Sequence, residues 1–81
     1  TELATLPNAT GKILEIRVAH DSPCINQAIR DLSLPDGVII VALLHKFQVK
    51  VPGAEDRILA GDRVVCIVRE DGRSRLLKLL A

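Results

Sequence analysis

The chain has 81 residues, enough for one domain and not for two. Its 11 basic residues nearly balance 10 acidic ones, which argues against a general nucleic-acid surface. With one aromatic residue, it also lacks a stacking platform for single strands. No signal peptide or membrane span is visible. Because Met is absent, we expect a piece of a longer protein or a chain processed at its start.

The expected core is aliphatic, because 48% of the residues are hydrophobic and Trp, Tyr and Met are missing. A domain this short buries only about 60% of its unfolded surface, so a partner would add needed burial. Cys24 and Cys66 stand apart in the sequence. We therefore expect two free buried thiols in a reducing compartment.

Residues 1–11 contain Pro7, Asn8 and Gly11 and resemble the end of a linker, so we place the domain at 12–81. Residues 12–20 alternate: Leu14 and Ile16 share one face, and Glu15 and Arg17 share the other. This pattern predicts a half-buried strand.

Asp21-Ser22-Pro23 is typical of a helix start, with Ser22 as the cap and Pro23 in the first turn. Apolar residues then recur at i, i+3, i+4 and i+7. They are Ile25, Ala28, Ile29 and Leu32. The pattern predicts a helix that Pro35 ends.

Two apolar runs, at 38–44 and 64–68, are rich in β-branched residues and bounded by turn residues. They predict strands buried on both faces, covered by helices or by a second copy of the chain. Residues 47–51 predict an antiparallel hairpin partner for the first run. Because His45-Lys46 lacks the usual Gly or Asn, the loop could be longer or bulged.

A short helical turn is expected at 55–59, with Asp62 bonding to the backbone in the next turn. The last strand is expected at 63–69 and a final leucine-rich helix at 74–81. The predicted fold is a single small α+β (α/β) domain. Its order is β-α-β-β-β-α, with a mixed sheet, two helices and a tendency to form dimers.

Several of these residues, at their spacings, resemble the TrkA-C, or RCK-C, family of potassium-transport regulators. The matching positions are Ile16-x-Val18, Ser22-Pro23, Ile29-x-x-Leu32-x-Leu34-Pro35, Ile39-Ile40, Val49-x-Val51-Pro52, Glu55-Asp56 and Gly61-Asp62-x-Val64. The resemblance implies a dimeric cytosolic domain that biases the gate of a membrane-embedded transporter or channel. The family usually has Gly where this chain has Asn26, a residue that tolerates the left-handed backbone.

The family's ligand cleft, carried over by position, would involve Ile39, Ile40, His45 and Pro52 of this chain. Some members bind cyclic di-AMP between two copies. Here the Arg that would face phosphate is missing, so we do not expect that ligand. A small nucleotide-type ligand is one option, and a structural dimerisation module without a ligand is the alternative.

Two chemical alternatives are weaker. His20 and Cys24 could form a nucleophile pair, but nothing supplies a third orienting group or an oxyanion site. His20, Cys24, His45 and Cys66 could ligate zinc, but their spacings match no zinc template. We therefore expect no enzyme, no metal and no nucleic-acid partner. The expected location is the cytoplasmic side of a membrane.

Overall fold

The computed structural model describes residues 2–5, 11–69 and 73–80. Five strands form one sheet in the order β1-β2-β5-β3-β4. They are β1 (Glu2–Thr5), β2 (Gly11–Arg17), β3 (Val38–His45), β4 (Gln48–Lys50) and β5 (Arg63–Arg69). Every pair of neighbouring strands is antiparallel, so the expected mixed sheet is wrong. No described helix is long and apolar enough to cross a membrane.

The strands predicted at 38–44 and 63–69 are confirmed, and the one predicted at 12–20 forms but ends at Arg17. The two apolar runs lie side by side as β3 and β5. The hairpin between β3 and β4 is also confirmed. Its loop is tight, because His45 pairs directly with Gln48. Lys46 takes a left-handed backbone, with φ of 56°, in place of the Gly or Asn that such turns favour. The extra residue lies within β3, as a bulge between Ile40 and Ala42.

The helix predicted after Pro23 is wrong. Only a short 3-10 turn, η1 (Ile29–Asp31), forms there. Asn26 has a φ of 67°, which a right-handed helix cannot include, and its N–H donates to the carbonyl of Ile58 at 2.6 Å. The N–H of Ile29 donates to Asp56 at 2.9 Å. The backbone bonds therefore run to the 54–58 segment instead of along a helix.

The helical turn expected at 55–59 is absent for the same reason, since Arg57 forms an isolated antiparallel bridge with Ala28. The burial that the apolar stripe predicted is nevertheless correct. Ala28 and Leu32 are buried, and Ile25 and Ile29 pack against the core. These apolar residues reach the core from an irregular segment that is held by backbone hydrogen bonds to residues 54–58.

The final helix is confirmed as α1 (Arg73–Leu80). Leu76 and Leu80 are fully buried in the core. The Ser22 hydroxyl donates to the Leu80 carbonyl at 2.9 Å. Ser22 therefore supplies a hydrogen-bond donor to a carbonyl at the end of α1, instead of capping the start of a helix of its own. The expected tail of a linker contains an observed strand, β1. Residues 1 and 6–10 of that segment lie outside the described residues, and the boundary at residue 12 stays a prediction.

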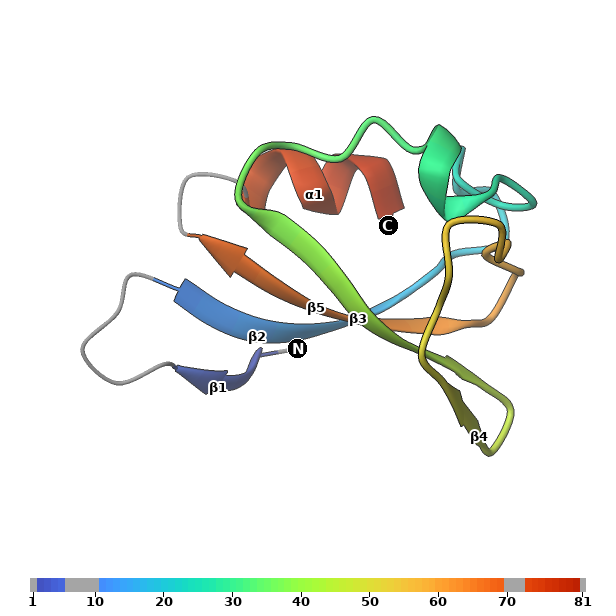
Figure 1. Cartoon of the computed structure of the whole chain (residues 1–81), viewed down its shortest axis with the longest axis horizontal. Coiled ribbons are helices and arrows are strands. Elements are labelled where there is room, and N and C mark those ends of the chain that lie inside the picture. The colour runs from blue at the N-terminus through green and yellow to red at the C-terminus, as the bar shows by residue number, and fades with distance from the viewer. Residues whose placement is uncertain (1, 6–10, 70–72, 81) are drawn as a thin grey trace.

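The helix α1 and the segment around η1 lie over one face of the sheet, here called the covered face (Figure 1). Seven of its strand residues are at most 8% exposed: Leu14, Ile16, Val38, Leu43, Val64, Cys66 and Val68. Both cysteines are free and buried, as predicted.

No described helix lies over the opposite face, here called the open face (Figure 1). Strand register places a second apolar set on it: Ile13, Ile39, Ala42, Leu44, Val49, Val65 and Ile67. Ile39 is 63% exposed and Val49 is 71% exposed. The prediction that 38–44 and 64–68 are buried on both faces is therefore wrong for the isolated chain.

Candidate functional site

The four residues suggested by position do not converge within one chain. Ile39 is on the open face, whereas Ile40 pairs with Cys66 and packs against the core from the covered face. His45 is at the end of β3, and Pro52 follows β4, half-buried. A site that uses all four would have to be completed by another copy or another molecule. Their role in binding stays a prediction.

Of the four, His45 lines a pocket. The pocket has a volume of about 340 Å³ and lies where the β3–β4 hairpin meets the 56–62 segment. Its walls mix aliphatic and charged side chains, among them Leu43, Lys50, Asp56 and Arg57. It could admit a small polar molecule, although two of its charged residues are already paired with each other.

That pair is Lys50 and Asp56, whose Nζ and Oδ1 atoms are 2.6 Å apart. The carboxylate of Asp56 also accepts the Gly53 N–H at 2.6 Å. The hydrogen bond from Lys50, followed by that from the Gly53 backbone, lowers the pKa of Asp56 below its ordinary value.

Asp62 forms the buried end of the same pocket, with 2% of its surface exposed. Its Oδ2 accepts the Leu59 N–H at 3.0 Å, which confirms the predicted turn contact. Its Oδ1 contacts Nδ1 of His45. This His–Asp contact could not be predicted from the sequence, because the two residues are 17 positions apart and belong to different elements. The contact ties the hairpin end to the start of β5.

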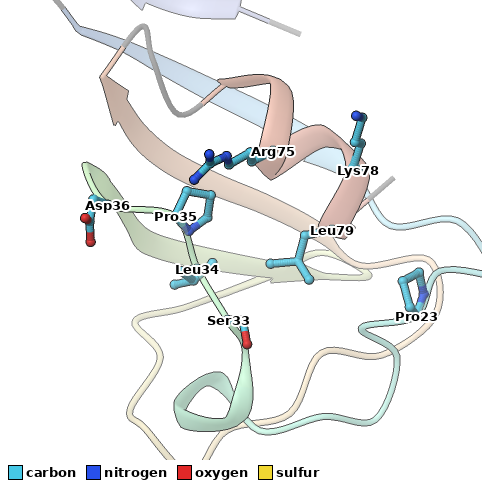
Figure 2. A pocket seen from close by; sticks show the side chains of 8 residues that line it. All are labelled: Pro23, Ser33, Leu34, Pro35, Asp36, Arg75, Lys78 and Leu79. Carbon is cyan, nitrogen blue, oxygen red and sulfur yellow. The ribbon is translucent and has the colours of Figure 1, made fainter.

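A second, more open pocket of about 500 Å³ lies between α1 and the segment before β3 (Figure 2). None of the four suggested residues lines it. Arg75 reaches from α1 toward Pro35 and Asp36, while Lys78 extends from the other side of the helix (Figure 2). Leu34 and Leu79 supply an apolar floor. The two cations do not converge on one point, so the pocket shows no preference for an anion.

The structure also places the other reactive side chains. Cys24 is fully buried, with its Sγ 3.1 Å from the Ser22 hydroxyl, while His20 is exposed. Burial raises the pKa of the Cys66 thiol to about 11, which disfavours the reactive thiolate. Among the described residues, no three His, Cys, Asp or Glu side chains gather in a group that could hold a metal ion.

Comparison with known proteins identifies the family. The model of the TrkA-C domain matches residues 13–81. The chain belongs to the TrkA-C domain family. This confirms the resemblance drawn from the sequence, and it accounts for nearly all of β2 and everything that follows.

A curated relative of this TrkA-C domain is the Trk system potassium uptake protein TrkA homolog of Archaeoglobus fulgidus, 27% identical over 70 residues. The match covers 86% of this chain and 16% of that protein, so the chain corresponds to a small part of the relative. The name of that relative is that of a potassium uptake protein.

Solved structures confirm the fold. An RCK domain, solved with cda, has a TM-score of 0.76 at 19% identity and covers 85% of this chain and 97% of its own. The S. agalactiae protein BusR, solved with its busA-promotor DNA, has a TM-score of 0.75 at 28% identity. That match covers 95% of this chain and 40% of BusR. The described sheet and helix are therefore an RCK-like arrangement.

Proposed function

We propose that this TrkA-C domain is a cytoplasmic regulatory module of a potassium or other ion transport protein. It would pair with a second copy and bias the gate of the membrane-embedded part of its parent. Family membership supports the class of function, and the similarity to a TrkA homolog supports potassium as the transported ion. The role is non-catalytic.

The observation that carries the proposal is the open face of the sheet. It combines seven aliphatic side chains on four adjacent strands, and only one of those strands lies at the sheet edge. Contiguous apolar surface of this kind is uncommon on monomers and marks an interaction site. A second copy would supply the extra burial that a domain of this size needs.

Gating would work as a population shift. If the paired domains adopt two arrangements, a ligand or neighbour that prefers one of them changes the gate only through that difference in affinity. Coupling of about 1–3 kcal/mol would change the affinity for the effector, or the balance of gate states, by about 5–150-fold.

A small ligand, if one acts, would bind where two copies bring Ile39, Ile40, His45 and Pro52 together. The His45–Asp62 contact supports this location, because it links a surface imidazole to the buried frame of the domain. The alternative is a structural dimerisation module without a ligand. The mixed, internally paired charges of the His45 pocket favour that alternative, as does the lack of the Arg that would face phosphate.

Light scattering coupled to size-exclusion chromatography, over a wide range of concentrations, tests the pairing. A dimer that dissociates on dilution supports the proposal, and a folded monomer at every concentration overturns it. Calorimetric titration of the dimer with mononucleotides, dinucleotides and cyclic dinucleotides then separates the two forms of the hypothesis. Binding that His45→Ala weakens, while the control Lys46→Ala does not, supports the ligand site.

We propose no DNA-binding role for this chain, although BusR was solved with promoter DNA. Basic and acidic residues are nearly equal in number, and several cations are neutralised within the domain, as in the Lys12–Glu2 and Lys50–Asp56 pairs. Fluorescence anisotropy with a labelled duplex should show no binding at physiological salt. Binding whose affinity falls steeply with salt would contradict this.

A further inference from the structure

The single aromatic residue of the chain lies outside its core. Phe47 is in the turn between β3 and β4 and is fully exposed. Val49 and Val51 follow it at 71% and 82% exposure, and they share a side because residues two apart in an extended chain point the same way. We call Phe47, Val49 and Val51 the hairpin patch. In Figure 1, the end of this hairpin projects away from α1 and from the other strands.

The fold of one chain does not require an apolar cluster at this place. A two-residue hairpin turn favours Asn or Gly, and an aromatic ring adds nothing to its geometry. Single exposed apolar residues are ordinary on protein surfaces, but a group of them marks a site of interaction. The hairpin patch therefore fits a partner that can take up a projecting apolar tip.

The charge beside the hairpin patch is positive. Residues 37–54 contain three basic side chains and no Asp or Glu. Two of the three already contact carboxylates of the 56–62 segment. The third is the exposed Lys46, which directly precedes Phe47, and no carboxylate of the described residues forms an ion pair with it. The hairpin end therefore presents one uncompensated cation next to its apolar tip.

An anionic lipid surface matches both features. Aromatic rings are stable at the boundary between the lipid headgroups and the acyl chains, and a basic residue is attracted to an anionic leaflet. The flexible stem of a lysine lets its ammonium reach the lipid phosphates while the neighbouring ring enters the apolar layer. Lipids also rearrange around a convex tip, whereas a protein partner would need a groove of matching shape.

We propose that the end of the β3–β4 hairpin docks on the anionic cytoplasmic surface of the membrane. The hairpin patch enters the headgroup boundary, and Lys46 contacts lipid phosphates. This inference rests on the proposed attachment to a transport protein, which holds the domain near the bilayer and raises the local lipid concentration. The contact of His45 with the buried Asp62 joins the docked hairpin to the start of β5. Docking therefore orients the whole domain relative to the membrane.

A tryptophan probe measures the docking directly. The chain has no Trp, so Phe47→Trp places a single indole in the hairpin patch. Leu3→Trp is the matched control, because Leu3 is exposed on β1, at the opposite edge of the sheet. Each 81-residue variant would be titrated with phosphatidylcholine vesicles that contain phosphatidylserine. We expect the Phe47→Trp emission to shift to shorter wavelength and to be quenched by lipids with brominated acyl chains. The Leu3→Trp emission should not change.

Co-sedimentation with the same vesicles compares substitutions, after circular dichroism has checked that each variant folds. Phe47→Ser should lower the partition coefficient by about tenfold or more, because it removes the ring that is buried on docking. Lys46→Gln should lower it by about fivefold. The control Leu3→Ser should change it by less than about twofold. Binding of the native chain should weaken in high salt and on vesicles of phosphatidylcholine alone.

Light scattering on the same samples separates this inference from the function on which it rests. A chain that is monomeric at every concentration overturns the proposed function, whatever the vesicles show. A dimer that binds no vesicles, or that Phe47→Ser and Leu3→Ser affect equally, overturns the docking and leaves the function standing. A Phe47→Ser variant that loses dimerisation instead of vesicle binding also overturns it, because the hairpin patch would then be a contact between copies. Selective loss of vesicle binding in Phe47→Ser and Lys46→Gln supports the docking.

Discussion

The covered and open faces of the sheet are built from the same kinds of side chain, yet they differ sharply in burial. Val64, Cys66 and Val68 of β5 are at most 1% exposed, whereas Val65 and Ile67 between them are only half-buried. The difference comes from what lies above each face: α1 and the 22–34 segment above one, and no described helix above the other. An unbroken apolar run therefore indicates that both faces of a strand are apolar. It does not show what covers each face.

The largest expected effect tests the covered face. Leu76→Ala removes a fully buried side chain of α1 and should lower the free energy of unfolding by about 2–5 kcal/mol. Ile39→Ala on the open face should lower it by less than about 1 kcal/mol in dilute solution. Urea denaturation at low micromolar concentration measures both. Equal losses would mean that the open face is covered even in the monomer.

A second test compares the buried Asp62 with its exposed partner His45. Asp62→Ala leaves the part-buried Leu59 N–H without its acceptor and should cost about 1–3 kcal/mol. His45→Ala removes a side chain that is about half exposed, and it should cost less than about 1 kcal/mol. The same denaturation assay compares them. A larger loss of stability in His45→Ala would show that the His45 side chain contributes more to folding than the hydrogen bond between Asp62 and the Leu59 N–H.

The strands were predictable because each carries its own signal: alternation in β2, and β-branched runs bounded by turns in β3 and β5. The leucine-rich α1 was predictable for a similar reason. The segment from Pro23 to Leu32 was not. Its apolar spacing is helical, but its backbone forms hydrogen bonds with residues 54–58. These long-range bonds compete with those of a helix, and the local spacing of apolar residues does not reveal them. Asn26, where the family usually has Gly, was the one local sign of a left-handed break.

The candidate site was less accessible to prediction than the fold. Positions 39, 40, 45 and 52 come from resemblance alone, and one chain separates them over two faces and a loop. The bulge in β3 contributes to this, because it shifts the register between Ile40 and Ala42. The contact between His45 and Asp62 depends on how the hairpin packs against the 59–62 turn. The residues next to His45 and Asp62 in the sequence do not predict it.

The Cys66 thiol provides a smaller effect with a clear sign. Its pKa is raised by burial from 9.0 to about 11, so above pH 9 the thiol ionises in the unfolded chain before it does in the folded one. The stability from this group is complete below pH 9 and is lost as the pH rises toward 11. Urea unfolding of the native protein and of Cys66→Ala should therefore converge over that range.

If the stabilities of the two proteins fell in parallel as the pH rises, the raised pKa of the Cys66 thiol would be contradicted. A matched thiol on the open face extends the test. Val65→Cys places a second cysteine next to Cys66 in sequence but on the opposite face. Near pH 8, it should react readily with a thiol reagent, while Cys66 stays unreactive until the protein unfolds.

The smallest expected effect concerns an ion pair on the open face, between Arg63 and Glu15. Arg63 of β5 lies diagonally across from Glu15 of β2, two positions along the register, with Arg63 Nη1 and Glu15 Oε1 3.2 Å apart. Arg63 is 40% exposed at its side chain, so solvent screens the pair, and Arg63→Ala should cost no more than about 1 kcal/mol. The loss should shrink further in high salt. A double-mutant cycle with Glu15→Ala, measured in dilute and in concentrated solution, isolates the pair. A coupling energy that grows with protein concentration would show that the pair becomes buried when two copies pack through their open faces.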